Sequence, residues 1–451
     1  MPFAFLLRHP DEQLQSAWNY AQLGLLVLPL WPLIGILMLL LGCGQTWRRQ
    51  YHLIVRRPLN WGLAIFSIWL VITTGFAYDR SYAFLGLFNF LPYFLVFTGY
   101  SALIQTPVQL RRWAGILVVT SVPVVTIGLG QIFWGWASHS QVVEFLWGGA
   151  IKPTGNPPGR MASVFMYANT LAGYLVVVFS LGLGLWIENL QTLTAKRHVP
   201  PTTWLRLGFL SLVVVGNLVA LILTDSRNAW AIAALIGLAF ALYQGWRWLI
   251  AGVAIATGSI LAAAFGPSPV QQWLRAVIPV FFWARLTDQM YPDRPLPTLR
   301  QTQWQFAWSL TQQHPWLGWG LRNFTPLYQA KMHVWLGHPH DFLLMLTAET
   351  GIPFAVFFCT WVSWIVIQGF QMLHNWTDVA SSASGQQLSR ERLIFFSYLV
   401  AFLACVLCNL VDVTVFDTRL NSLGWLLLSA ICGVVYHRRA IRASLALKPY
   451  R

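Results

Sequence analysis

Two histidines and an aspartate stand directly ahead of a long apolar run, in the stretch GHPHDFLLMLTAETGIP at 337–353. Polar groups are costly in lipid, so their presence at the start of a membrane segment indicates a function. A histidine can take a proton from a hydroxyl near neutral pH. We therefore expect His340 to be catalytic, Asp341 to be its neighbour or orienting group, and His338 to lie at the rim of the site. A structural role at the start of a helix is the alternative for each of them.

The His-x-His spacing also suits a metal ion, but the other ligands that a metal site needs are sparse. Carboxylates are scattered along the chain, and no HExxH, DxD or histidine-linked CxxC pattern accompanies the pair. We therefore expect no metal site.

Three arginines lie in other polar clusters that interrupt apolar sequence. Arg160 follows the turn-forming TGNPPG and precedes Asn169, while Arg227 lies in LTDSRNAW and Arg300 begins RQTQWQFAWSL. Arginine binds phosphate oxygens through forked hydrogen bonds and keeps its charge. Each arginine also has a plainer explanation. Arg160 suits an interfacial side chain that snorkels, Arg227 an ion pair with Asp225 within a hairpin, and Arg300 a cationic amphipathic helix.

The composition indicates a membrane protein. The chain has 451 residues, of which 57% are hydrophobic and 10% charged, and its mean hydropathy is +0.57. Soluble proteins carry roughly 25% charged residues, so we expect a polytopic protein surrounded by membrane lipids. The 25 tryptophans suit the two membrane–water interfaces. The net charge of +15 does not indicate nucleic acid, because the basic residues lie in short loops between apolar runs, as topology signals do.

Apolar segments of the length that a membrane helix needs, about 20 residues, recur along the chain. They predict an all-α polytopic membrane helix bundle, with one integral membrane domain over 1–451 and no strand pattern. In the first segment, Pro29 and Pro32 either kink one helix or separate two short ones. The eleven expected spans are 18–42, 59–77, 82–104, 113–136, 165–188, 206–224, 228–245, 247–265, 342–373, 393–412 and 419–437.

Basic residues predict the orientation of these spans. With eleven spans, the basic loops and the basic C-terminal tail all fall on one side, which the positive-inside rule makes cytoplasmic. The opposite, periplasmic side then receives two longer loops, 137–164 and 266–341. The larger loop is too long for a mere connection and contains aromatic, helix-like pieces. We expect it to form a helical cap over the membrane.

This topology places the arginines and His340 on the same, periplasmic face. Several arginines beside one histidine suit the transfer of a group from a membrane-bound diphosphate donor to an alcohol acceptor.

At this point the motifs resemble a known family. GRMASVFMYANTLAGY, LTDSRNAW, HPWLGWGLRNF and GHPHDFLLMLTAETGIPF occur in the order seen in the O-antigen ligase and O-antigen polymerase superfamily. His340 and Asp341, followed after nine residues by Gly351, resemble the ligase signature. NLVDVTVFDTRLNSLGWLLL resembles the last helical hairpin of the family, so the similarity covers roughly 150–440.

The resemblance implies a GT-C-type bundle of about 11–12 transmembrane helices in the bacterial inner membrane. It implies an undecaprenyl-diphosphate-linked glycan as donor, a lipid, glycan or protein hydroxyl as acceptor, and no cofactor or metal. Carried over by position, Arg160, Arg227 and Arg300 would bind the diphosphate, with Arg227 also catalytic. His340 would orient or deprotonate the acceptor, and the arginines would stabilise the departing lipid diphosphate. Asp412 and Asn169 would be secondary residues of the site, and a polar pair of Asp412 with Asn409 at a helix end is the alternative for Asp412.

Two positions depart from the pattern of the family. Tyr167-Ala168-Asn169 stands where relatives often have Asn-Pro-Asn, and Asp341 stands where they commonly have asparagine. A carboxylate beside His340 would raise the pKa of the imidazole or select its tautomer. These departures bear on the choice of acceptor and on activity.

Four functions compete. A glycan ligase and an O-antigen or exopolysaccharide polymerase differ only in the acceptor. Some proteins of photosynthetic bacteria that resemble this family were proposed to take part in inorganic-carbon uptake, and a structural member of a polysaccharide-export assembly is the fourth. A transporter should place polar groups near the bilayer midplane. Since Arg227 and His340 are expected at one face, the sequence favours an enzyme.

Overall fold

The computed structural model of the chain describes residues 8–138, 140–195, 200–287, 295–376 and 385–446. These residues form α-helices and two short 3-10 helices and contain no strand, so the all-α prediction is confirmed. The elements, in chain order, are η1 (Glu12–Leu14), α1 (Gln15–Val27), α2 (Pro32–Arg56), α3 (Pro58–Gly75), α4 (Arg80–Leu87), α5 (Leu91–Leu103), α6 (Pro107–Trp134), α7 (Gln141–Trp147), α8 (Ala168–Ala195), α9 (Pro201–Leu223), α10 (Arg227–Gln244), α11 (Arg247–Phe265), α12 (Ser268–Val277), α13 (Val280–Leu286), η2 (Leu296–Thr298), α14 (Arg300–Gln313), α15 (Phe324–Met332), α16 (Phe342–Thr350), α17 (Ile352–His374), α18 (Gly385–Val411) and α19 (Thr418–Ala446).

Within the described residues, nine helical segments are long and apolar enough to cross a membrane. They support the polytopic bundle, and two of the eleven expected spans are not among them. The segment 18–42 divides into α1 and α2 around Pro29, and Pro32 begins the second helix. Proline has no N–H for the helix ladder and favours the first helical turn, which explains the division. The segment 228–245 forms α10, whose polar ends lower its mean hydropathy.

The expected span 342–373 is wrong as a single helix, because the structure divides it at Gly351. This residue has φ of 85° and separates α16 from α17. A Cβ atom there would lie 2.2 Å from the backbone oxygen of Trp316, so a side chain cannot be accommodated. The backbone N–H of Ile352 donates to the oxygen of Pro315 at 2.8 Å. The break places α16 outside the nine segments that can cross a membrane and among the helices α12 to α16, which we call the cap.

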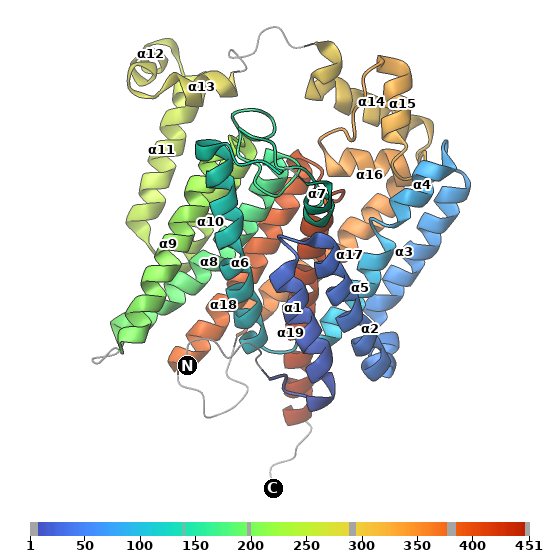
Figure 1. Cartoon of the computed structure of the whole chain (residues 1–451), viewed down its shortest axis with the longest axis vertical. Coiled ribbons are helices and arrows are strands. Elements are labelled where there is room, and N and C mark those ends of the chain that lie inside the picture. Colours follow the sequence, from blue (N-terminus) through green and yellow to red (C-terminus); the bar gives the residue numbers. More distant parts are fainter. Residues whose placement is uncertain (1–7, 139, 196–199, 288–294, 377–384, 447–451) are drawn as a thin grey trace.

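The most deeply buried of the candidate spans carry residues of the site. Helices α8, α18 and α19 pack together in the middle of the bundle, with α5, α6, α9 and α17 around them (Figure 1). Asn169 lies in the first turn of α8, and Asp412 directly follows α18. The two polar residues are therefore positioned by the ends of the most deeply buried helices of the bundle.

The described part of 266–341 is helical and lies at one end of the bundle. Figure 1 shows α12 and α13 above α11, with α14, α15 and α16 across from them at the same end. Residues 288–294 lie outside the described part of the chain. Helices α14, α15 and α16 share a small apolar core of their own, formed by Phe306, Ala307, Leu310, Phe324, Tyr328 and Ala348.

Candidate functional site

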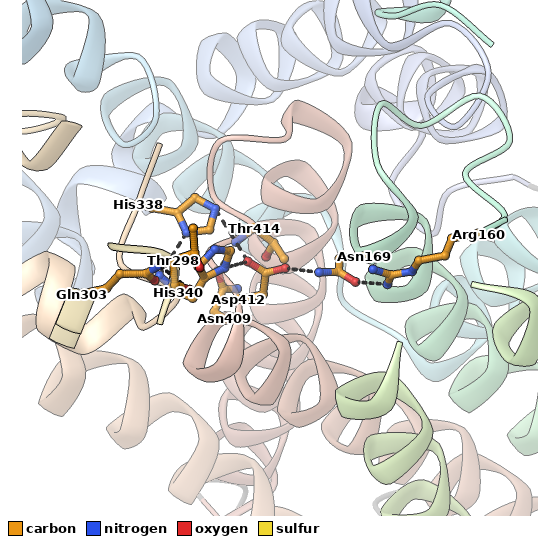
Figure 2. A network of polar contacts seen from close by, with 9 residues as sticks. All are labelled: Arg160, Asn169, Thr298, Gln303, His338, His340, Asn409, Asp412 and Thr414. Atoms are coloured by element: carbon orange, nitrogen blue, oxygen red, sulfur yellow. Dashed lines mark hydrogen bonds and ion pairs between the residues drawn. The ribbon is translucent and has the colours of Figure 1, made fainter. Parts of the chain in front are cut away.

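Four side chains from distant parts of the sequence form one chain of hydrogen bonds (Figure 2). The Nη2 of Arg160 donates to the Oδ1 of Asn169 at 2.6 Å, and the Nδ2 of Asn169 donates to the Oδ2 of Asp412 at 2.8 Å. The other carboxylate oxygen of Asp412 lies 2.8 Å from the Nδ1 of His340. Four residues named from the sequence are therefore brought together.

A tight turn and a neighbouring hairpin hold Arg160 in place. The carbonyl oxygen of Arg160 would lie 1.8 Å from a Cβ atom at Gly155, whose φ is 91°, so this turn requires glycine. The Nε of Arg160 donates to the backbone oxygen of Thr224 at 2.8 Å. Since Arg227 begins α10 three residues later, these two arginines belong to the same corner of the site. The side chain of Arg227 is exposed there.

The amide of Asn169 can bridge its partners in only one orientation. An arginine can only donate and an ionised carboxylate can only accept. The amide oxygen must therefore face Arg160 and the amide nitrogen must face Asp412. In the triplet Tyr167-Ala168-Asn169, only the third residue matches the Asn-Pro-Asn of relatives, and this asparagine forms the bridge.

Asp412 is ionised at neutral pH. Burial alone would raise the pKa of its carboxyl group, but the hydrogen bond from His340, the electrostatic interactions with His340 and His338 and the bond from Asn169 outweigh that effect. Together they lower the pKa of Asp412 to about 2. The carboxylate therefore accepts from both sides and carries a negative charge between Arg160 and the histidines.

The proton of a neutral His340 lies on Nδ1, because the ionised carboxylate of Asp412 can only accept. The lone pair then lies on Nε2. No residue that the structure describes makes a hydrogen bond to this nitrogen, and the side chain of His340 is 28% exposed. An imidazole held in this way is suited to accept a proton from a bound hydroxyl.

The backbone of His340 is in the left-handed region, with φ of 54°. A residue other than glycine is rare there, and the conformation costs roughly 1–3 kcal/mol. Two contacts retain it: the backbone N–H of His340 donates to the Nδ1 of His338 at 3.2 Å, and its ring contacts Asp412. Strain of this kind concentrates at functional sites.

His338 is a neutral group beside the same carboxylate. Burial lowers its pKa to about 4, and the nearby positive charges of His340 and Arg300 act in the same direction, against the attraction of Asp412. Its Nε2 lies 3.6 Å from the Oδ1 of Asp412. Its ring stacks against Phe416, with centroids 6.0 Å apart and planes at 21°.

His338, His340 and Asp412 also form the kind of group that can hold a metal ion, since their ligand atoms lie within 4.8 Å of one another. Two imidazoles and a carboxylate suit several transition metals. However, the Nδ1 of His338 accepts the N–H of His340, which keeps the proton of His338 on the nitrogen that faces Asp412. A metal ion would have to replace that proton. The hydrogen bonds therefore favour a proton-carrying network at this position.

Asp341 has a different role from the orienting one that the sequence suggested. Its Oδ1 accepts from the backbone N–H of Leu344 at 2.9 Å and caps α16. The carboxylate that contacts His340 comes from Asp412, 72 residues away in the chain.

Arg300 begins α14, is exposed, and acts on His338 through its positive charge. The structure thus joins Arg160, Asn169, Asp412 and the two histidines in one network, with Arg300 close enough to act on His338. Arg227 stands three residues after Thr224, the residue whose backbone oxygen accepts from Arg160. Sequence reasoning missed Arg322 and Phe416. Arg322 stands in the quoted motif HPWLGWGLRNF, but no spacing connected it with His338.

Comparison with protein families gives one match. Residues 212–359 match a family model described as O-antigen ligase. The match confirms the resemblance to the O-antigen ligase superfamily, and it includes Arg227, Arg300 and His340. Arg160, Asn169 and Asp412 lie outside it. No curated protein matches the chain at a significant level.

Proposed function

We propose that this chain, whose residues 212–359 match the O-antigen ligase family, is a membrane glycosyltransferase of the O-antigen ligase type. It would transfer a glycan from an undecaprenyl-diphosphate donor to a hydroxyl group of a lipid, glycan or protein acceptor. The single observation that carries the proposal is the hydrogen-bonded chain Arg160–Asn169–Asp412–His340, which joins an anion-binding group to a base (Figure 2).

The base of the reaction is His340. Its Nε2 takes the proton of the acceptor hydroxyl, while the oxygen of that hydroxyl attacks the anomeric carbon of the donor sugar. The imidazole becomes an imidazolium, and Asp412 stabilises the new positive charge at a distance of 2.8 Å. The new glycosidic bond replaces the bond between the anomeric carbon and the diphosphate oxygen. The electron pair of the broken bond leaves with undecaprenyl diphosphate.

The arginines would stabilise this leaving group. Arg160, Arg227 and Arg300 come from three different segments, a geometry that suits the several oxygens of a diphosphate. Arg227 and Arg300 each stand at the first position of a helix, where backbone N–H groups also favour an anion. Arg160 is already oriented by Asn169 and Thr224, so less side-chain entropy is lost when it binds.

The arrangement of the bundle supports a periplasmic site in a bacterial inner membrane. The cap helices and α7 lie at one end, and the connection from α2 to α3 lies at the other (Figure 1). Arg56 ends α2 and Arg57 forms that connection, while Arg111 and Arg112 stand near the start of α6. Basic residues favour the cytoplasmic side, so the site end would face the periplasm and the C-terminus the cytoplasm.

A transfer assay tests the proposal. Purified protein is mixed with an undecaprenyl-diphosphate-linked glycan and a panel of acceptors, beside His340→Ala. A matched control is His333→Asn, since His333 is an exposed histidine at the end of α15 with φ of 55°, a conformation that asparagine tolerates. We expect transfer by the wild type and by His333→Asn, and its loss in His340→Ala.

The acceptor that is consumed distinguishes the two enzymatic alternatives. Transfer to a second lipid-linked glycan identifies a polymerase, and transfer to another lipid, glycan or protein identifies a ligase. Folded wild-type protein that transfers to none of these acceptors would refute the proposal and favour a role related to inorganic-carbon transport or to a polysaccharide-export assembly.

A further inference from the structure

Arg322 places a further positive charge next to the histidine pair. It lies between α14 and α15, and its guanidinium carbon is 5.3 Å from the centroid of the Phe416 ring. The same Phe416 ring stacks against His338, whose centroid lies 4.4 Å from that of His340. An aromatic ring attracts a cation to its face without using the N–H groups of that cation. Phe416 therefore positions the guanidinium and leaves its hydrogen-bond donors available.

The guanidinium group of Arg322 makes no hydrogen bond or ion pair of 4.0 Å or less with the residues that the structure describes, although the residue is half-buried. An arginine has five N–H donors, which normally find acceptors. Burial raises the pKa of the Glu349 carboxyl group to about 7, and the positive charge of Arg322 acts against this rise. Part of this carboxyl population is uncharged at neutral pH, so it compensates the charge of Arg322 incompletely.

The backbone at Arg322 is strained as well. Its φ is 60°, in the left-handed region where glycine is the usual residue. The side chain of Arg322 also packs closely against Gly86 of α4, where an added Cβ atom would lie 3.2 Å from the Cγ of Arg322. An arginine in this conformation stores local strain, which the surrounding contacts must offset.

The order of contacts places Arg322 on the side of the base that is remote from Arg160. The Oδ2 of Asp412 faces Asn169 and Arg160, whereas its Oδ1 faces the histidines. Figure 2 shows Arg160 and His338 at opposite ends of this network. Arg322 follows beyond His338, through Phe416. With the donor diphosphate at the Arg160 end and Arg300 reaching it from the first turn of α14, the remaining cation near His338 is Arg322, and we place the approach of the acceptor on its side.

We propose that Arg322 is an acceptor-recognition residue, which binds an oxyanion, either a phosphate or a carboxylate, that the acceptor carries near its reactive hydroxyl. Phe416 is its positioning residue. This inference rests on the proposed function, because His340 defines the acceptor side. It restricts the acceptor to acidic molecules, such as a glycan that ends in a uronic acid or in a phosphorylated sugar.

Binding of small probes tests the inference without requiring turnover. The probes are methyl glucuronide, methyl glucoside 6-phosphate and, as the neutral control, methyl glucoside, with dissociation constants measured by ligand-observed NMR on the full chain in detergent. The wild type should bind one or both acidic probes more tightly than the neutral one, and the stronger acidic probe identifies the anion. Arg322→Gln should weaken that binding by about 10–100-fold, the range for a hydrogen bond to a charged group. It should change binding of the neutral probe by less than about 2-fold.

Three further variants separate recognition from folding. Arg322→Lys keeps the charge but loses the fork, so it should restore part of the affinity. Arg322→Gly suits φ of 60° and should be at least as stable as the wild type, yet should bind the acidic probes as weakly as Arg322→Gln. Phe416→Leu removes the aromatic face and should weaken acidic probes by a smaller factor.

Equal binding of acidic and neutral probes by the wild type would overturn the inference. So would Arg322→Gln if it weakened binding of the undecaprenyl-diphosphate donor instead, since Arg322 would then belong to the donor side. Failure of the proposed function has a different signature, namely absence of transfer with every acceptor while the acidic probes still bind in an Arg322-dependent way.

Discussion

Asp412→Asn should separate the charge of the carboxylate from its shape. The substitution preserves size but leaves a single acceptor oxygen. In the wild type, His340 and Asn169 each donate to a carboxylate oxygen of their own. One of them must then face an amide N–H group. The variant also loses the negative charge that stabilises the imidazolium of His340 during the reaction. We therefore expect a lower kcat, with the KM for the donor nearly unchanged.

The distance sets the size of the effect. Opposite charges 2.8 Å apart attract by roughly 6 kcal/mol at an effective dielectric constant of about 20. The side chains of His340 and Asp412 are 28% and 18% exposed, so solvent screens part of this attraction. About half of it, roughly 3 kcal/mol, corresponds to a decrease in kcat of about 100-fold.

The assay measures the initial rate of transfer from an undecaprenyl-diphosphate glycan at pH 6 and pH 8. Because the pKa of Asp412 is lowered to about 2, the carboxylate is ionised at both values and the loss should be the same at each. Asp341→Asn is the matched control. Asparagine caps a helix about as well as aspartate, so this variant should keep at least half of the rate. A folded Asp412→Asn protein with more than a third of the wild-type rate would refute the reasoning, as would an equal loss in Asp341→Asn.

The other predictions concern stability and donor binding. The pKa of Glu349 is raised from 4.5 to about 7, so the protonated carboxyl group stabilises the fold below pH 4.5 and this stabilisation is lost as pH rises through about 7. Glu349→Gln should therefore be more stable than the wild type by roughly 3 kcal/mol at pH 8. Equal unfolding temperatures of the two proteins at pH 8 would contradict this. The pKa of His338 is lowered from 6.5 to about 4, so the neutral imidazole stabilises the fold above pH 6.5 and this stabilisation is lost as pH falls through about 4. His338→Gln should therefore reduce the decrease in unfolding temperature between pH 6.5 and pH 4. Gly351→Ala should destabilise the protein by about 2–4 kcal/mol, because its Cβ atom would lie 2.2 Å from a backbone oxygen, and an unchanged unfolding temperature would show that the loop yields. Asn169→Ala should raise the KM for the donor by about 10-fold because Arg160 loses its orienting acceptor, whereas an effect on the KM for the acceptor alone would place Arg160 elsewhere.

Membrane helices could be predicted from the sequence because each is a continuous local signal. Twenty apolar residues suffice to define a span, and their backbone groups are satisfied within the helix itself. The single-helix prediction for 342–373 failed for a reason that composition does not show. The break at Gly351 depends on the backbone of Trp316, which packs against it from another segment.

Residue types at the site could likewise be named from the sequence, since few chemistries suit an arginine or a histidine at a membrane surface. Their partners could not be assigned, because spacing along the chain does not show which side chains meet. Asp341 adjoins His340 in the chain and was the natural candidate for its orienting carboxylate, but its side chain caps α16. Arg322 was visible in a quoted motif, yet only its contact with Phe416 connects it with His338.

The sequence by itself determined the all-α membrane architecture, the superfamily resemblance and the residue types available for chemistry, because these depend on local composition and short spacings. Only the tertiary structure decided which residues meet. Asn169 and Asp412 are 243 residues apart in the chain, and His340 and Asp412 are 72 apart. Contacts over such separations depend on how α8, α18 and the cap pack against one another, and the close packing of whole helices determines that geometry.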